Sequence, residues 1–130
     1  MNYYITRKIK AEFEEAINDI NEKLKEVGFG VLTRINLNEK FKEKLNVDFR
    51  NYTILGACNP AFAHQALQLE DKLGVMLPCN VIVQETGDGM IEVSAINPLV
   101  SMQATENQEL LQLASEVHKR MEKMLNSPNG

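Results

Sequence analysis

The sequence predicts an α+β fold, in which an antiparallel sheet of about five strands packs against helices. Three observations support this class. Short segments rich in β-branched and apolar residues recur along the chain, longer segments carry apolar residues at helical spacing, and the turn Gly87-Asp88-Gly89 joins two of the short segments as a hairpin. The chain of 130 residues has no repeat and no long linker, so we expect one domain over residues 1–130, with a frayed tail at 126–130.

The first part of the chain predicts a strand, a helix and a second strand. Residues 3–9 mix aromatic, β-branched and charged side chains, which suits a strand with one face in water. Residues 10–27 carry the apolar stripe of an amphipathic helix, and Gly28 follows where a helix commonly ends. Residues 30–35 are predicted to form the next strand. The helical stripe consists of Phe13, Ala16, Ile17, Ile20, Leu24 and Val27.

A short surface helix and a strongly apolar strand follow. Residues 38–46 hold few apolar side chains among Lys and Glu, and Asn38 is the expected N-cap of this helix. Residues 51–58 are apolar on both alternating faces, so this strand must be covered on both sides. A helix layer, a partner subunit or a ligand would each supply the second cover. One face carries Ile54 and Cys58, and the other carries Leu55 and Ala57.

The pair Asn59-Pro60 is expected to open the next helix. An Asn side chain accepts a hydrogen bond at the N-cap, and proline suits the first helical position. We expect the helix to run to about Leu73, with Gly74 ending it and residues 75–78 forming an extended connector. The inward-facing residues are expected to be Ala63, Ala66, Leu67 and Leu73.

The last part of the chain predicts the hairpin and a long helix. Residues 79–86 and 90–96 are its two strands, and Asn97-Pro98 ends the second one. Residues 106–125 carry leucine, valine and methionine at helical spacing. Helices grouped around this run of strands favour a sheet with its helices on one face.

Charge and hydropathy exclude two classes of partner. The 14 basic and 18 acidic residues give a net charge of -4, whereas nucleic-acid binding through phosphates requires clustered Lys and Arg. No run reaches the roughly 18 apolar residues of a membrane span, and the first residues lack the apolar stretch of a signal peptide. We therefore expect a cytoplasmic protein that binds neither nucleic acid nor membrane.

Cys58 and Cys79 are the strongest candidates for chemistry. Cys58 ends a strand beside the N-terminus of the helix that begins at Pro60, where the partial positive charge favours a thiolate. Cys79 begins the following strand, so the two sulfurs share a neighbourhood if these strands are antiparallel neighbours. His64 lies one turn into the helix and is expected to lean toward Cys58.

Other interpretations of these side chains stay open. Free cysteine is often buried as a small apolar residue, so both cysteines also fit an ordinary core. Zinc needs more ligands than this region offers, a cuprous ion is satisfied by soft thiolates, and a CxxC redox motif is absent. Glu85 and Glu92 are expected to face each other across the hairpin, where a role as solvated surface residues is favoured over acid–base catalysis. His118 is likewise expected to be a solvated surface residue.

Two motifs resemble those of one known family. The chain contains Cys58-Asn59-Pro60 and, about twenty residues later, Leu77-Pro78-Cys79-Asn80, and with the segments 52–60, 63–67, 74–81 and 96–98 it resembles the bacterial and archaeal family catalogued as domain of unknown function 302. The resemblance covers nearly the whole chain. It implies one α+β domain of the TATA-binding-protein-like fold class, often dimeric, with no established activity. The candidate site residues that it carries over are Cys58, Asn59, Pro60, Cys79 and Asn80.

The leading hypothesis is a small dimeric binding module whose pocket holds a small molecule or a soft metal ion. Cys58 and Cys79 would be the metal ligands. One alternative is a thiol-based redox enzyme with Cys58 as nucleophile and Cys79 as resolving partner, and another is a purely structural dimer built on the strand at 51–58 and the Met-rich last helix. No catalytic constellation and no cofactor are identified. The expected pocket residues are Cys58, Asn59, Pro60, His64, Cys79 and Asn80.

Overall fold

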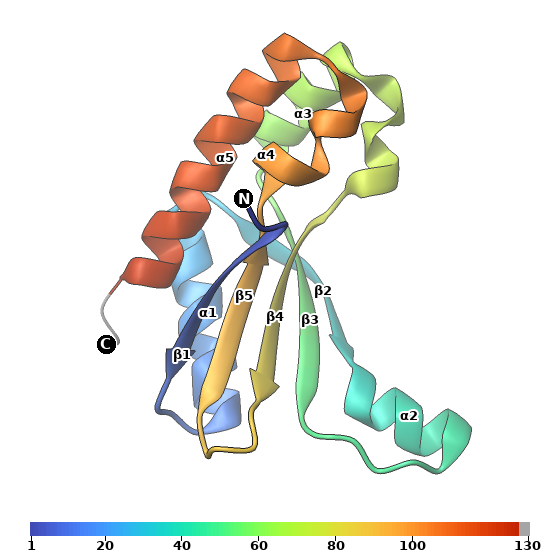
Figure 1. Ribbon diagram of the computed structural model, residues 1–130, viewed down its shortest axis with the longest axis vertical. Coiled ribbons are helices and arrows are strands. Elements are labelled where there is room, and N and C mark those ends of the chain that lie inside the picture. The colour runs from blue at the N-terminus through green and yellow to red at the C-terminus, as the bar shows by residue number, and fades with distance from the viewer. Residues whose placement is uncertain (128–130) are drawn as a thin grey trace.

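The computed structural model describes residues 1–127 and places five strands in one sheet. The strands follow the order β1-β5-β4-β3-β2, and every adjacent pair is antiparallel (Figure 1). The predicted α+β fold with an antiparallel sheet is therefore confirmed. The strand bounds are β1 (Tyr4–Ile9), β2 (Gly30–Asn36), β3 (Tyr52–Cys58), β4 (Cys79–Glu85) and β5 (Ile91–Ile96).

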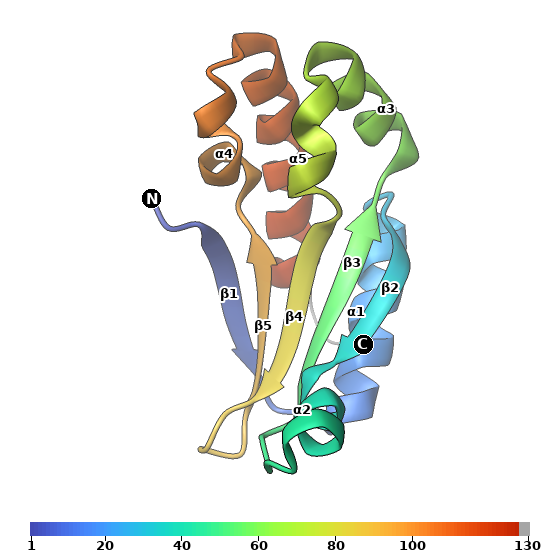
Figure 2. The ribbon, with the colours of Figure 1, turned by 90° about the vertical axis from the view of Figure 1, so that its right-hand side faces the viewer.

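The two longest helices lie on one face of the sheet. Helix α1 and the C-terminal half of α5 cover this face, whereas α2 projects from the end of the sheet that carries the β4–β5 turn (Figures 1 and 2). The opposite face carries no helix layer in the described part of the chain. The helices are α1 (Phe13–Glu26), α2 (Leu37–Leu45), α3 (Pro60–Leu69), α4 (Pro98–Ser101) and α5 (Gln108–Asn126), with 3-10 helices at Asp71–Met76 and Gln103–Thr105.

The main core lies between the sheet and helices α1 and α5. Because successive strand residues point to opposite faces, Leu55 and Ala57 of β3 are fully buried, whereas Ile54 and Cys58 are half-buried on the other side. A helix layer therefore supplies only one of the two covers that this apolar strand requires. The largest fully buried side chains of this core include Ile17, Leu24, Leu55, Val81, Val83, Val93, Met121 and Met124.

Helix α5 is longer than the sheet on which it packs. Its 19 residues span about 28 Å, whereas a seven-residue strand spans only about 23 Å. The N-terminal half of α5 therefore extends past the ends of β3 and β4, where α3 and α4 lie beside it (Figure 1). A second, smaller core forms there from Ala66, Leu73, Met102, Leu110 and Ala114.

Helix α3 begins as predicted but ends early. Asn59 caps it through a side-chain acceptor, yet the helix stops at Leu69 because Glu70 adopts an extended backbone. The Leu69 carbonyl accepts a hydrogen bond from the side chain of Asn107 at 3.0 Å, so a distant residue helps to fix this end. A 3-10 helix at Asp71–Met76 replaces the predicted last turn and the first half of the predicted connector.

Two further local predictions were wrong. Leu67 was expected to face inward but is 39% exposed. Asn38 does not cap α2, because the helix already begins at Leu37 and the cap position falls on Asn36, which makes no side-chain cap bond. The Asn38 side chain instead accepts a hydrogen bond from the Tyr52 backbone N–H at 3.3 Å, which ties α2 to β3.

The hairpin glutamates do not face each other. The strand register pairs Gln84 with Glu92 and Glu85 with Ile91, so the two glutamates lie on opposite faces of the sheet. Glu85 accepts a hydrogen bond from Asn51, and Glu92 accepts one from Gln84. Neither geometry brings the two carboxylates together for acid–base chemistry.

The apolar stripe of α5 is buried within the chain. Met121 and Met124 are 0% and 1% exposed, so they are not available as the predicted dimer interface. His118 Nδ1 lies 3.3 Å from Glu122 Oε1 in the same helix. Of the predicted frayed tail, Asn126 is the last residue of α5, and residues 128–130 lie outside the described part of the chain.

Candidate functional site

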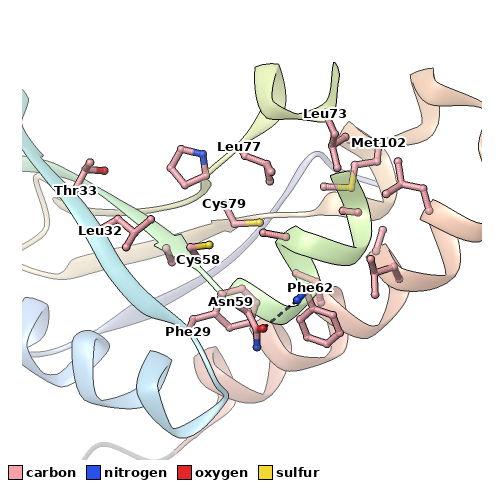
Figure 3. Close-up of a pocket in the computed structure, with 18 residues that line it drawn as sticks. Phe29, Leu32, Thr33, Cys58, Asn59, Phe62, Leu73, Leu77, Cys79 and Met102 are labelled. Atoms are coloured by element: carbon pink, nitrogen blue, oxygen red, sulfur yellow. Dashed lines mark hydrogen bonds between the residues drawn. The ribbon is translucent and has the colours of Figure 1, made fainter. Parts of the chain in front are cut away.

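A cavity of about 310 Å³ lies beyond the ends of β3 and β4, where α3 and the overhanging half of α5 form its walls (Figure 3). It occupies the junction between the main core and the second core. No charged side chain lines it among residues 1–127. The lining residues are Phe29, Leu32, Thr33, Ala57, Cys58, Asn59, Phe62, Ala63, Ala66, Leu73, Leu77, Pro78, Cys79, Met102, Leu110, Leu113, Ala114 and Val117.

Small side chains on the facing helices leave this space unfilled. Ala63 and Ala66 of α3 and Ala114 of α5 contribute only methyl groups to the walls. Leu32 is 69% exposed and Thr33 is also exposed, whereas the remaining lining residues are buried or half-buried. The cavity therefore opens at edge strand β2, beside a register irregularity of the kind that bends a strand edge.

Cys58 and Cys79 both lie against this cavity with free thiols. Ala57 is the register partner of Cys79, so Cys58 lies one residue further along the neighbouring strand. Strand spacings of about 4.8 Å and about 3.4 Å per residue put the two Cα atoms roughly 6 Å apart. The antiparallel pairing of β3 and β4 therefore brings the two cysteines into one neighbourhood.

The environment of Cys79 disfavours its thiolate. The residue is only 8% exposed, and burial, with a smaller contribution from the charge of Cys58, raises the pKa of the Cys79 thiol to about 11. At neutral pH this thiol keeps its proton. Cys58 is half-buried and is the more accessible of the two.

The structure divides the other predicted site residues between the cavity and the surface. Asn59 lines the cavity, and its side chain accepts a hydrogen bond from the Phe62 backbone N–H at 3.1 Å. Pro60 and His64 are exposed and are not among the residues that line the cavity. Asn80 is exposed on the bare face of the sheet, because it follows Cys79 and points the opposite way.

Several residues of the cavity were missed from the sequence. Phe62 forms part of the wall, and the Arg120 guanidinium lies 4.8 Å from its ring centroid while donating to the Val27 carbonyl at 3.0 Å. These contacts join α1, α3 and α5 and have no local sequence pattern. The one local signal was the pair Ala63 and Ala66, whose small side chains share the inward face of α3.

The polar groups of the cavity wall are two thiols, one hydroxyl and one amide, and they do not form a metal site with three or more ligands. Within residues 1–127 no group of three or more His, Cys, Asp and Glu side chains is arranged to hold a metal ion. A zinc site of the usual kind therefore has no ligand set here.

None of the described helices has both the length and the apolar character that crossing a membrane requires.

At Gly56, the backbone lies too close to Thr33 and Pro78 for a side chain to fit. An added Cβ would lie 2.8 Å from Pro78 Cγ and would also collide with Thr33 Oγ1, and both neighbours line the cavity. We expect Gly56→Ala to lower the free energy of unfolding by about 1–3 kcal/mol through overpacking. Urea unfolding should show this loss.

The matched control for this prediction is Gly30→Ala. Gly30 is also a strand glycine, but no atom lies within 4 Å of its added Cβ. This substitution should leave stability unchanged or slightly raise it, because alanine restricts the unfolded chain. Equal losses in the two variants would show that crowding at Gly56 is not the cause.

Fold and site together define a small α+β protein with one bare sheet face and an apolar cavity at the end of its antiparallel sheet. The family described as Domain of unknown function DUF302 matches residues 5–128, and the chain belongs to this family. The resemblance drawn from the two cysteine motifs is thereby confirmed. The family description names no activity.

A solved structure shares this architecture. It is described as the crystal structure of uncharacterized conserved protein DUF302 from Bacillus stearothermophilus and is 29% identical to this chain. The match covers 95% of this chain and 96% of that chain, with a TM-score of 0.89. No curated protein matches the chain.

Proposed function

We propose that this chain is a single-domain binding protein for a small apolar molecule, which it holds in the cavity between α3, α5 and the end of the sheet. The uncharged cavity of about 310 Å³ is the observation that supports this function. Small-molecule pockets are mostly apolar and measure roughly 300–1,000 Å³. An apolar cavity of about 150 Å³ accommodates benzene, so this one has room for a two-ring compound or a short alkyl chain.

The lining residues favour recognition over turnover. Burial of the apolar ligand surface would supply most of the affinity, at about 25 cal/mol per Å² before the costs of association. Asn59 and Thr33 are the neutral polar side chains of the wall, and Thr33 lies at the opening. A ligand would enter past Leu32 and Thr33, with its apolar end between the alanines of α3 and α5.

The thiol-based redox alternative has less support. A resolving thiol attacks as its thiolate, but the pKa of Cys79 is raised to about 11 by burial. Almost all of this thiol is therefore protonated at neutral pH. The two free cysteines do support the proposed cytoplasmic location, because disulfides form mainly in oxidising compartments.

We further propose that α2 and the segment after it bind a second copy of the chain. No residue of α2 is buried, and Leu45, Val47 and Phe49 are 66%, 47% and 39% exposed. A helix of nine residues is marginal in water without packing partners. A homodimer would cover this apolar segment.

The binding function is tested by filling the cavity. We expect 1-aminonaphthalene, a neutral two-ring fluorescent probe, to bind the protein saturably with one site per chain. Ala63→Phe should abolish this binding, because its ring would occupy the cavity that Ala63 lines. Fluorescence titration measures the effect, and thermal unfolding verifies that the variant is folded.

Ala61→Phe is the matched control for the binding experiment. Ala61 lies on the same helix but is exposed and does not line the cavity. This variant should bind the probe as the unmodified protein does. Absence of saturable binding to the unmodified protein, or equal binding to both phenylalanine variants, would refute the proposed function.

Self-association is tested with Leu45→Asp. Leu45 is 66% exposed, so the charge should leave the fold of one chain intact while disrupting a dimer through α2. Size-exclusion chromatography with light scattering should show a dimer for the unmodified protein and a monomer for the variant. A monomeric unmodified protein at high micromolar concentration would contradict this proposal.

A further inference from the structure

The cavity is longer than it is wide. Helix α3 contributes lining residues from Asn59 to Ala66, and α5 contributes them from Leu110 to Val117. At about 1.5 Å per residue, each of these walls extends over about 10 Å. A volume of about 310 Å³ along this length corresponds to a mean cross-section of about 30 Å². Carbon atoms in contact lie about 4 Å apart, so one alkyl chain needs about 16–20 Å² and two chains do not fit side by side.

The two ends of the cavity differ in polarity (Figure 3). At the sheet end, Thr33 of β2 carries a hydroxyl, and Asn59 directly after β3 carries an amide. The inner end belongs to the second core, where the buried side chains of Ala66, Leu73 and Met102 offer only hydrocarbon and one thioether. A polar group would lose its hydration at the inner end without gaining a hydrogen bond. A ligand with one polar end therefore binds with its apolar end inward.

The polar end of such a ligand carries no charge. No Lys, Arg, His, Asp or Glu lines the cavity within residues 1–127, so a carboxylate or an ammonium group would have no partner there. The net charge of -4 further disfavours an anion. The Asn59 oxygen accepts from the Phe62 backbone, which leaves its amide N–H groups for other acceptors. A hydroxyl or carbonyl oxygen suits these N–H groups and the Thr33 hydroxyl.

Volume and length set the size of the ligand. Benzene occupies an apolar cavity of about 150 Å³, so a cavity of about 310 Å³ corresponds to about twelve non-hydrogen atoms. An extended chain advances about 1.2 Å per bond, so walls of about 10 Å correspond to about eight carbons. Both limits indicate a chain of medium length.

We propose that the ligand of this cavity is one unbranched aliphatic chain of about eight to twelve carbons that ends in an uncharged oxygen group, such as a medium-chain alcohol. This inference rests on the proposed function and narrows it to one chemical class. The chain enters past Thr33, runs between the facing alanines of α3 and α5, and ends near Met102. Ala66 limits its length, because a larger side chain there would fill the inner end.

The experiment measures how 1-hexanol, 1-octanol and 1-decanol displace 1-aminonaphthalene from the full chain, followed by fluorescence. The affinity should rise about fourfold with each added methylene, as the burial of one CH₂ group predicts. 1-Decanol should therefore bind more than about 100-fold tighter than 1-hexanol. Octanoate should displace the probe at least about tenfold less well than 1-octanol, because its carboxylate finds no partner in the wall.

Ala66→Leu tests the inner end of the cavity. The variant should bind 1-decanol at least about tenfold more weakly, whereas its affinity for 1-hexanol should stay within about twofold, because the shorter chain does not need the inner end. Ala61→Leu is the matched control, since Ala61 is exposed on the same helix and does not line the cavity. It should leave both affinities unchanged. If Ala66→Leu does not fold by thermal unfolding, Ala114→Val on the facing helix should give the same selective loss.

Three outcomes would overturn the proposed ligand class. They are an affinity that does not rise with chain length, equal displacement by octanoate and 1-octanol, and equal losses of both alcohols in Ala66→Leu. The probe separates this inference from the function on which it rests. A protein that binds 1-aminonaphthalene but none of the alcohols refutes only the aliphatic class, whereas a protein that does not bind the probe saturably refutes the proposed function as well.

Discussion

Replacing Leu55 by alanine should lower the free energy of unfolding by about 2–5 kcal/mol. Leu55 is 0% exposed in β3, which is paired on both sides within the sheet and packs against the main core. The truncation removes buried apolar surface and leaves a cavity that the neighbouring strands and helices cannot close. Chemical denaturation, followed by circular dichroism, measures the loss as a lower midpoint.

Leu32→Ala provides the same chemical change at an exposed position. Leu32 belongs to the adjacent strand β2 and is 69% exposed, so its truncation should change stability by no more than about 0.5 kcal/mol. The contrast between the two variants measures the burial of the core face of β3. Similar losses in both would contradict the assignment of Leu55 to the core.

The free energy of unfolding should fall by about 2 kcal/mol between about pH 9 and pH 11 because of Cys79 alone. In the folded chain, burial and then the charge of Cys58 raise the pKa of Cys79 from its ordinary value of 9.0 to about 11. Above pH 9 the unfolded chain releases this proton while the folded chain still holds it. The contribution is therefore complete below pH 9 and is lost as the pH rises through the folded pKa.

Denaturant unfolding of the unmodified protein and Cys79→Val over this pH range isolates the effect. Every other ionisable residue is the same in the two proteins, so the difference between their pH profiles belongs to Cys79. Cys58→Ala should retain most of the slope, because burial is the larger cause of the shift. Parallel profiles for the unmodified protein and Cys79→Val would show that the folded chain does not disfavour the thiolate.

The sequence by itself determined the elements whose physical causes are local. Alternating apolar residues predicted the burial of Leu55 and Ala57, and residues 79–86 and 90–96 were recognised as a hairpin. Asn59-Pro60 marked the start of α3 through an N-cap hydrogen bond that spans only three residues. Such signals depend on neighbours within one turn or one strand, so a single sequence displays them.

Part of the candidate site could also be predicted from the sequence. Cys58 and Cys79 were expected to be close if their strands were antiparallel neighbours, and the structure has them in that arrangement. His64 is exposed and does not line the cavity, because the rotation of α3 about its axis decides which side chains face inward. That rotation is fixed by packing on α5 and not by the distance of His64 from the helix start.

Only the tertiary structure decided where the chain has space for a ligand. The cavity exists because α5 overhangs the sheet and faces α3 across small side chains at Ala63, Ala66 and Ala114. The end of α3 likewise depends on a hydrogen bond from Asn107 to Leu69, between residues far apart in the chain. Cavity volume and helix ends of this kind depend on how separate elements are placed relative to one another. The spacing of apolar residues within one element carries no information about that placement.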